Sequence, residues 1–553
     1  MSNKLRQWFA IHPKWMLALI TIATLSPFLA KPFNIDDPLF VWAAQQIQAH
    51  PGNPYGFDVN WYGRVLPMWL VTENPPLTCY YLALAAGIFG WSEIGFHFAC
   101  LLPAIMVVLG TYRLAKSFCR WPQFAALATL FMPGLLVSAT TVMCDVSMLA
   151  FWIWTVVFWT EGIKQDNGWK LATAGTLLAL ALLTKYFGIC LIPLLAVYGW
   201  LEKRTVGCWA SYLLIPLATL CAYEWLTRQL YGQASFVAAT HYANFMQTSS
   251  GISSVVKAVN ALTFTGGCFA IALFCAPFLW CKRVLAMLAG GAAFFVALAL
   301  ADGMMAENYT WFNEGVRSRV EIQIIFWSIG GVCVLALALA DVRHKQDASS
   351  WLLLLWVLGT FTFTAFVNWT VNVRALLPMT PAVAILIARR LEQNRPSLSG
   401  GIKLALVASA AFSLLAAQAD FQLAGAVRQN AKQVCAKFAA NPGAVWFQGH
   451  WGFQYYMQSF GAVAIDINHP LMQSGGVLII PSQNVNQRPP DPKKATLLEI
   501  FSTPVIPWFA TFSPDVGASF YASFFGPLPF AFGDVLPDTV FVFVLKPPAE
   551  TSP

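Results

Sequence analysis

The sequence is dominated by long apolar runs, and this feature most constrains the structures that the chain can form. Several runs contain about 15–20 residues with few charges, which is long enough to cross a bilayer core of roughly 30 Å. Only 10% of the residues are charged, whereas soluble domains carry about 25%. A single water-soluble core, a disordered chain and a small disulfide scaffold are therefore excluded. The sequence predicts a polytopic α-helical membrane protein.

Thirteen of the runs are predicted to be transmembrane helices, at residues 15–30, 97–114, 122–138, 146–160, 171–187, 188–201, 207–227, 263–281, 284–301, 322–340, 351–368, 375–390 and 402–418. A further run, 76–90, is predicted to lie along the membrane surface, and the distribution of Lys and Arg decides this. If 76–90 stays outside the membrane and the N-terminus is cytoplasmic, the inside ends carry about twice as many Lys and Arg as the outside ends; if 76–90 spans, the excess is reversed. Positive residues are retained on the cytoplasmic side, so the first arrangement is preferred.

This topology predicts a transmembrane domain at 1–419, with a long first external loop at 31–96, and an outside C-terminal segment. Residues 420–553 are richer in Pro and Gly and contain short β-prone runs, so they are predicted to form a small α/β extramembrane domain. Its aromatic residues between 446 and 456 are expected to form a core, with acceptor binding as the alternative. The net charge of +8 is dispersed between apolar runs and gives no indication of nucleic-acid binding.

Acidic residues gather at the predicted outer face. Asp36 and Asp37 open the first external loop, and two close carboxylates raise the pKa of one of them, which suits a general base. Asp145 stands at the outer end of an apolar run, where an acid is a functional candidate. The alternative interpretation is helix capping, since acids before Pro38 or Val146 also suit the first turn of a helix.

Two basic residues, Lys185 and Arg374, are predicted to reach the same face. Each has an alternative role, in which its long side chain extends to the lipid headgroups. Together, acids and bases at one face of an apolar bundle are what a reaction with a lipid phosphate requires. A carboxylate would activate the acceptor, and cations would hold the leaving phosphate.

Five short motifs share this face: Asp36-Asp37, Pro75-Pro76-Leu77 opening the membrane-lying run, Asp145 at a helix start, Leu183-Thr184-Lys185, and Arg374 followed by Leu377-Pro378-Met379-Thr380-Pro381. In this order they resemble the GT-C superfamily of lipid-linked-sugar glycosyltransferases, especially the bacterial branch related to aminoarabinose transferases and protein O-mannosyltransferases. The resemblance covers residues 1–418 and is strongest from 31 to 190. It implies a polyprenyl-phosphate sugar donor and inverting transfer to a hydroxyl of a glycolipid, glycan or protein acceptor.

The resemblance also implies roles for individual residues. Asp36 and Asp37 would be catalytic, with Asp36 as the general base, and Asp37 and Asp145 would position the acceptor or a divalent cation. Asp36 and Asp145 are the implied ligands if such a cation is used; no other cofactor is implied. The implied substrate-binding residues are Glu73, Asp145, Lys185, Arg374 and Arg64. In a bacterium, the protein would lie in the inner membrane with its active site and C-terminal domain in the periplasm.

Two positions depart from the family pattern. Asn74 stands where many relatives have a basic residue or His before Pro-Pro, and Cys100 lies where many have an Arg before Leu-Pro. The corresponding phosphate contacts are therefore absent or supplied elsewhere, for instance by Arg64, Arg317 or Arg319.

Two other functions stay open. A lipid-linked-sugar flippase or transporter would place charges in mid-helix, and Glu224 is the main acid there. A polysaccharide polymerase or ligase would use similar chemistry on longer substrates. No Trp-Trp-Asp motif occurs, which argues against transfer of a preassembled glycan to Asn.

Overall fold

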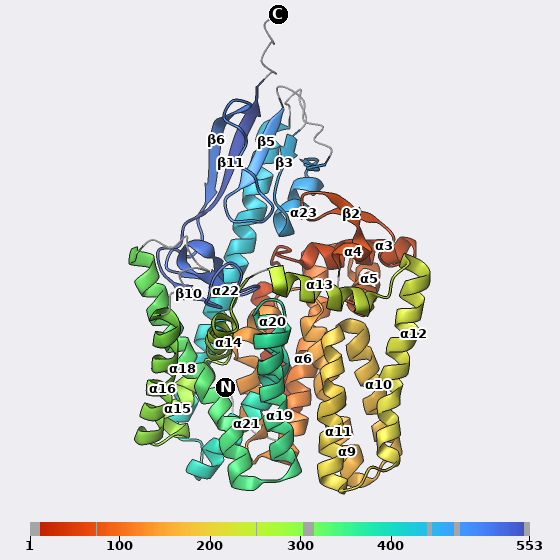
Figure 1. Cartoon of the computed structure of the whole chain (residues 1–553), viewed down its shortest axis with the longest axis vertical. Coiled ribbons are helices and arrows are strands. Elements are labelled where there is room, and N and C mark those ends of the chain that lie inside the picture. Colours follow the sequence, from red (N-terminus) through yellow and green to blue (C-terminus); the bar gives the residue numbers. More distant parts are fainter. Residues whose placement is uncertain are drawn as a thin grey trace, which may run out of the picture.

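The computed structural model describes residues 12–72, 74–249, 251–301, 314–439, 445–468 and 476–546. Most of these residues form a bundle of helices, and a strand-containing part stands at one end of the bundle (Figure 1). The end that carries this part is called the outer end below. The mostly helical architecture and the presence of a C-terminal segment with strands are confirmed.

The bundle is built from the apolar segments of the chain. Its helices are α2 (Pro13–Leu25), α6 (Glu93–Phe118), α7 (Pro122–Leu130), α8 (Pro133–Ser138), α9 (Asp145–Gln165), α10 (Gly168–Thr184), α11 (Leu191–Lys203), α12 (Leu214–Tyr231), α14 (Ser254–Cys268), α15 (Ile271–Leu279), α16 (Lys282–Ala301), α18 (Glu314–Lys345), α19 (Ala348–Thr362), α20 (Val373–Leu376), α21 (Thr380–Asn394) and α22 (Gly400–Phe438). Short 3-10 turns adjoin them at η1 (Ser26–Phe28), η2 (Tyr186–Cys190), η3 (Cys208–Leu213) and η5 (Leu377–Met379), and η4 (Phe363–Val367) is a π-helical turn.

Seven helices in the described part of the chain are long and apolar enough to cross a membrane, and the pair α14–α15, bent by 83°, would make an eighth. The chain is therefore an integral membrane protein, and thirteen crossings stays a prediction. Some predicted spans are divided at Pro residues, which lack the backbone N–H of a regular helical turn. The run 122–138 is split before Pro133, and the run 375–390 passes through η5, which contains Pro378.

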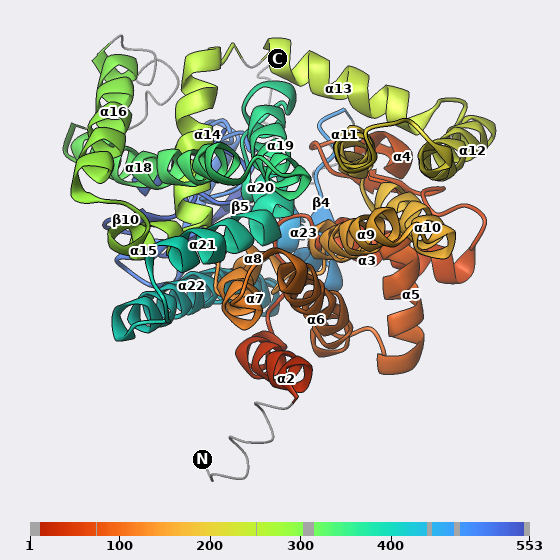
Figure 2. The ribbon, with the colours of Figure 1, turned by 90° about the horizontal axis from the view of Figure 1, so that it is seen from below.

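The first external loop covers part of the outer end. It contains α3 (Asp37–Ala49), a hairpin of β1 (Asp58–Asn60) and β2 (Val65–Pro67), α4 (Met68–Val71) and α5 (Leu77–Phe89). Seen along the bundle, α5 and α13 (Ser235–Ser249) lie lengthwise while α9 and α11 are viewed nearly end-on (Figure 2). These two helices therefore run across the bundle and not along it.

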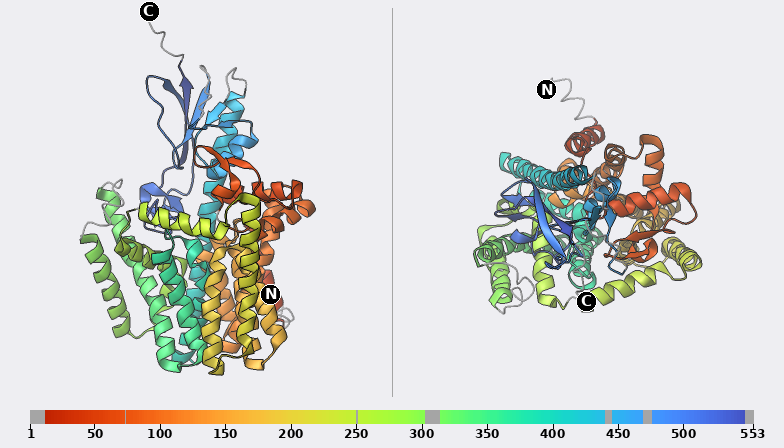
Figure 3. Two further views of the ribbon diagram at one scale, coloured as in Figure 1. Left: turned by 45° about the vertical axis from the view of Figure 1, so that its right-hand side comes forward. Right: turned by 90° about the horizontal axis from the view of Figure 1, so that it is seen from above.

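A five-stranded sheet forms the centre of the C-terminal part, with the order β4-β3-β5-β11-β6. The strands are β3 (Val445–Phe447), β4 (Val463–Ala464), β5 (Val477–Pro481), β6 (Ala495–Thr503) and β11 (Asp538–Leu545). β3 is parallel to β4 and β5, whereas β11 pairs antiparallel with β5 and β6. The helix α23 (Trp451–Ser459) and the end of α22 cover one face of the sheet, where Val434 packs with Val540 and Val542. α22 runs without a break from the bundle into this part (Figure 3), so residue 420 lies within a continuous helix.

Residues 504–537, between β6 and β11, turn back from the sheet to the bundle, and we call them the return segment. They contain β7 (Phe509–Ala510), β8 (Phe512–Ser513), η6 (Pro514–Val516), β9 (Ala518–Ser519) and β10 (Ala531–Phe532). Phe509, Phe520 and Phe530 join the same buried cluster as the bundle helices. The N–H of Val373 donates to the carbonyl of Phe520 over 3.2 Å. The C-terminal part is therefore packed into the outer end of the bundle.

A buried ion pair fastens these parts together. The side chains of Lys31 and Asp420 are bonded to each other and are both 0% exposed. Asp420 also accepts hydrogen bonds from the hydroxyls of Thr511 and Tyr521, at 3.0 and 2.8 Å. Lys31 donates to Thr140 at 3.2 Å. The first external loop, the α8–α9 connection, α22 and the return segment thus meet at one polar cluster.

Candidate active site

A cavity of about 520 Å³ opens at the outer end of the bundle. Its walls come from the first external loop, α13, the bundle, the return segment and two loops of the C-terminal sheet. The lining side chains include Ile35, Asp36, Tyr55, Trp61, Asn74, Lys185, Tyr242, Asn368, Trp369, Asn372, Arg374, Trp451, Asn486, Phe512 and Phe525. Among the described lining residues, the charged ones are Asp36, Lys185 and Arg374.

Asp36 stands at the N-terminus of α3, with Pro38 in the first turn of that helix. Its Oδ2 lies 2.8 Å from Nη1 of Arg374, and the two side chains keep 25% and 22% of their surface exposed. Ile35, immediately before it, has a φ of +47°. This left-handed region is energetically unfavourable for a β-branched residue, so the backbone beside Asp36 is strained.

Asp145 and Lys185 form the second ion pair of the site, with Oδ1 and Nζ 2.6 Å apart. Asp145 is the first residue of α9, and Lys185 follows the last residue of α10. Because these consecutive helices pack side by side in opposite directions, the start of one lies beside the end of the other. Asp145 is nearly buried, at 4% exposure, while Lys185 keeps 24%.

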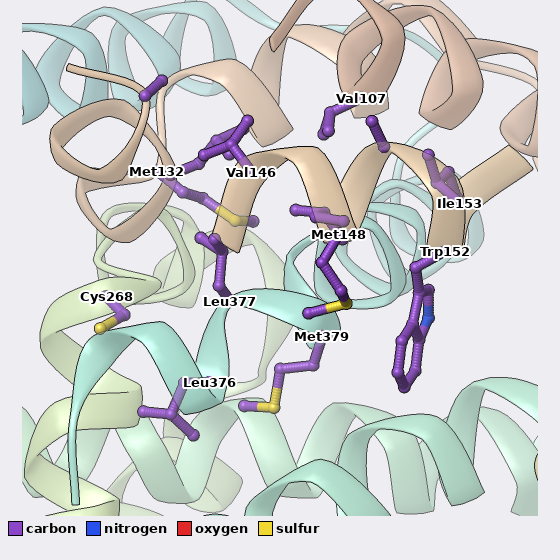
Figure 4. Close-up of a cluster of buried hydrophobic side chains, with 14 of the residues drawn as sticks. Val107, Met132, Val146, Met148, Trp152, Ile153, Cys268, Leu376, Leu377 and Met379 are labelled. Carbon is purple, nitrogen blue, oxygen red and sulfur yellow. The ribbon is translucent and has the colours of Figure 1, made fainter. Parts of the chain in front are cut away.

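A buried apolar cluster holds the two ion pairs near each other. Val146, Met148 and Trp152 of α9 face Leu377 and Met379 of η5 (Figure 4). Asp145 and Arg374 lie just before these packed segments in the sequence, so both side chains emerge at the outer end. Nη1 of Arg374 is also 3.1 Å from Sδ of Met143. Burial lowers the pKa of Arg374, but the charges of Asp36 and Asp145 outweigh it and hold that pKa above its usual value.

Asp37 lies apart from this group. Its side chain is buried, and its oxygens accept backbone N–H bonds from Asn34 at 2.9 Å and from Val142 at 3.0 Å. Burial raises the pKa of Asp37 to about 7, although the charge of Lys31 opposes the shift. The carboxylate thus ties the first external loop to the α8–α9 connection, and it does not line the cavity.

Of the remaining predicted residues, Arg64, Arg317 and Arg319 are not among the lining residues. Arg64 is exposed between β1 and β2, and Glu73 lies outside the described residues. Arg317 and Arg319, on α18, pair with Glu321 and Asp534, at 2.9 and 2.6 Å.

Glu224, the acid expected in mid-helix, holds α13 in place. Its carboxylate accepts the N–H of Phe236, at 2.9 and 3.0 Å to the two oxygens, and the hydroxyl of Tyr186 at 3.3 Å. Phe236 is in the first turn of α13, where backbone N–H groups lack partners within the helix. Glu224 therefore acts as a cap for this helix.

The residues present are a poor fit for a divalent cation. In the described part of the chain, no three His, Cys, Asp or Glu side chains are grouped to hold a metal ion. Of the two acids implied as ligands, Asp36 lines the cavity and Asp145 is nearly buried behind Lys185, and each is already paired with a base. A cation would have to displace both bases, so we assign it no role.

Several aromatic lining residues were not predicted from the sequence, among them Tyr55, Trp61, Tyr242, Trp369, Phe512 and Phe525. In an apolar sequence, the type of residue gives no signal that separates cavity walls from core. Of the aromatic residues between 446 and 456, Phe447, Phe453 and Tyr456 are in the core of the C-terminal part. Trp451 differs, because it lines the cavity.

Comparison with known proteins agrees with the motifs. Residues 73–222, about a quarter of the chain, match the family model for dolichyl-phosphate-mannose-protein mannosyltransferase. This match includes Asp145 and Lys185 but neither Asp36 nor Arg374. The resemblance to GT-C glycosyltransferases is thereby confirmed. No curated protein matches the chain.

Matching solved structures include an oligosaccharyltransferase of Archaeoglobus fulgidus tethered with an acceptor peptide, at 12% identity and a TM-score of 0.49. That match covers 83% of this chain and 64% of the other, so this chain spans less than two thirds of the oligosaccharyltransferase. ArnT from Cupriavidus metallidurans bound to undecaprenyl phosphate matches at 14% identity and a TM-score of 0.46, over 98% of both chains.

Proposed function

We propose that this protein is a glycosyltransferase that moves a sugar from a polyprenyl-phosphate donor to an acceptor hydroxyl in the outer cavity. The observation that carries the proposal is the pairing of Asp36 with Arg374 and of Asp145 with Lys185 at one cavity. The pairs supply a carboxylate that can act as a base and two cations that can bind a phosphate. The match to a family named for transfer from dolichyl-phosphate-mannose supports a lipid-linked donor.

The first step is an exchange of partners. The donor is a phosphodiester with one negative charge, and its phosphate oxygens compete with the carboxylates for Arg374 and Lys185. Arg374 suits this role because its planar fork has several N–H donors, of which one group now serves Asp36. As Arg374 turns to the phosphate, the carboxylate of Asp36 loses its partner and is free to accept a proton from the acceptor.

The transfer itself is an in-line displacement with inversion. Asp36 takes the proton of the acceptor hydroxyl while the acceptor oxygen bonds to C1 of the sugar. The bond between C1 and the phosphate oxygen breaks, and its electron pair leaves with polyprenyl phosphate. Lys185 and Arg374 stabilise the extra negative charge that develops on this leaving group. Asp145 orients Lys185, and Asp37 holds the loops that position Asp36.

The arrangement favours transfer over transport. A flippase needs charged groups along a path through the bilayer, but Asp36, Asp145, Lys185 and Arg374 gather at one end of the bundle. Glu224, the acid that favoured transport, caps α13. We further propose that the outer end faces the periplasm of a bacterial inner membrane, because the charge bias of the loops places the opposite end in the cytoplasm.

The test measures release of polyprenyl phosphate from radiolabelled polyprenyl-phosphate pentoses and hexoses by the full-length protein in proteoliposomes, with a cell-membrane extract added to supply the acceptor. The wild type is compared with Asp36→Asn and with the control Asp534→Asn, whose side chain is 90% exposed on the return segment. We expect release that Asp36→Asn lowers by at least about 10²-fold and that Asp534→Asn leaves unchanged. Donor movement across the bilayer without cleavage would overturn the proposal in favour of a flippase. Equal release by wild type and Asp36→Asn would remove Asp36 from the role of base.

A further inference from the structure

Strained backbone positions are concentrated at the cavity. Among the described residues, six that are not glycine have a positive φ. Three of them stand at helix ends, where this conformation is usual: Asp166, Arg204 and Gln346. The other three, Ile35, Trp451 and Asn486, all line the cavity.

Trp451 is the most unusual of these residues. Asn adopts the left-handed region fairly readily, but a bulky side chain there is a genuine outlier. Trp451 has a φ of +63° at the first position of α23. Strain of this kind persists where the surrounding structure imposes it, and it gathers at ligand sites. The indole of Trp451, at this strained position, is half-buried and forms part of the cavity wall.

Packing fixes the orientation of this indole. Its ring meets the rings of Phe512 and Phe525 edge to face, with centroids 5.4 and 5.7 Å away. Both phenylalanines belong to the return segment and line the same cavity. The C-terminal part therefore builds a fixed aromatic wall at the site, and not only a cover above it.

Asn486 is tied to the same wall. Its loop is held by Asn484, which accepts the backbone N–H of His450 at 2.7 Å and donates to the carbonyl of His450 at 3.1 Å. His450 directly precedes Trp451, so these two hydrogen bonds set the position of Asn486 relative to the indole. Asn486 is exposed, and its amide can both donate and accept hydrogen bonds.

The chemistry of the wall indicates what it recognises. Apart from the three charged residues assigned to the donor phosphate and its reaction, the described lining residues are neutral: they are mainly aromatic rings and the amides of Asn74, Asn368, Asn372 and Asn486. A charged acceptor would have no counter-charge there. A sugar presents apolar C–H faces that pack on aromatic rings and hydroxyls that pair with amides. The indole of Trp451 and the amide of Asn486, which line the same cavity, match both features.

We propose that Trp451 and Asn486 form the acceptor subsite and that the acceptor is the uncharged part of a carbohydrate. This inference rests on the proposed function and narrows it to a glycan or the sugar portion of a glycolipid, in preference to a protein. The C-terminal part thereby supplies acceptor specificity, while Asp36, Lys185 and Arg374 supply the chemistry.

The test follows the labelled sugar from the donor into membranes of the source cell, as the acceptor fraction, with purified full-length protein. Variants are Trp451→Ala, Trp451→Tyr and Asn486→Gly, which preserves the positive φ at its position. The matched control is Trp508→Ala, since Trp508 is 51% exposed on the return segment and is not among the cavity residues. Thermal unfolding of each variant verifies folding. The label is then classified by its resistance to proteinase.

We expect the label to be resistant to proteinase. Trp451→Ala should lower kcat/KM for the acceptor at least about tenfold, the equivalent of losing one buried aromatic contact, while KM for the donor changes less than about threefold. Asn486→Gly should act in the same direction, Trp451→Tyr should recover part of the loss, and Trp508→Ala should match the wild type. Label that proteinase releases, or equal losses for Trp451→Ala and Trp508→Ala, would overturn this inference alone. Absence of donor cleavage by the wild type would instead overturn the proposed function, and this inference with it.

Discussion

Replacing Arg374 by Lys keeps the charge of this residue but removes the planar fork of N–H donors that would bind the donor phosphate. Nη1 of Arg374 is bonded to Asp36 at 2.8 Å. Its Nε is buried and has no hydrogen-bond partner among the described residues. A guanidinium that leaves Asp36 can therefore offer several N–H donors in a fixed planar geometry to the donor phosphate, whereas a single ammonium at the end of a flexible chain cannot reproduce that geometry.

The expected loss follows from this difference. Arg374→Lys removes one charge-assisted hydrogen bond to the phosphate, about 1.5–3 kcal/mol, which corresponds to about a 10- to 150-fold lower kcat/KM for the donor. Stability should change little, by about 0–1 kcal/mol, because both members of the Arg374–Asp36 pair remain partly exposed. The measurements are donor cleavage in proteoliposomes and thermal unfolding in detergent.

The control is Arg319→Lys, because Arg319 also forms an ion pair with an Asp, Asp534, at 2.6 Å. Its pair is more exposed, at 59% and 90%, and lies away from the cavity. We expect Arg319→Lys to be close to wild type in both measurements. Wild-type kcat/KM for Arg374→Lys would refute the role of the guanidinium fork. A fall in unfolding temperature that accounts for the whole loss of activity would refute it equally.

Three further predictions concern the surroundings of the site. Asp37→Asn should lower the free energy of unfolding by about 1–3 kcal/mol, because the amide N–H₂ would face one of the two backbone N–H groups that the carboxylate now accepts. Turnover per folded molecule should fall less than tenfold. A loss of turnover with unchanged stability would contradict this. Lys31→Met should cost about 3–5 kcal/mol in thermal unfolding by leaving Asp420 buried and unpaired, and unchanged stability would contradict the buried pair. Burial raises the pKa of Asp538 from 3.8 to about 6, so the stability it confers is full below about pH 4 and is lost as the pH rises through 6. Burial lowers the pKa of His450 from 6.5 to about 4, so its contribution is lost as the pH falls over the same range. Between pH 4 and pH 7, the unfolding temperature should therefore fall less steeply with rising pH in Asp538→Asn than in the wild type, and more steeply in His450→Gln. Equal slopes in the wild type and both variants would refute these two pKa shifts.

The sequence predicts much of the charged part of the site because charge is rare in this chain. Lys and Arg in the loops indicate which helix ends share a side, and Asp36, Asp145, Lys185 and Arg374 then fall on one side. The same reasoning does not separate Asp36 from its neighbour Asp37. That distinction depends on the turn at Ile35, which has a positive φ. A β-branched residue gives no sign in the sequence that it adopts this conformation.

The neutral walls could not be predicted in this way. From the sequence, the return segment resembles an ordinary connection between two strands. In the structure, Phe509 and Phe520 of this segment pack into the bundle. Its position depends on tertiary contacts such as that of Tyr521 with Asp420, which leave no periodic pattern. The number of crossings is also hard to predict, since breaks such as the 83° bend between α14 and α15 occur inside continuous apolar runs.

The pairing of charges at the cavity reconciles two opposing demands. An unpaired charge beside an apolar bundle is costly, but transfer needs a free carboxylate and free cations at the moment of reaction. With Asp36 on Arg374 and Asp145 on Lys185, the four charges sum to zero before the donor binds. A phosphate that takes over the cations releases Asp36 only when a substrate is present to use it. The base is therefore activated by the donor itself, and a rigid neutral wall is left to select the acceptor.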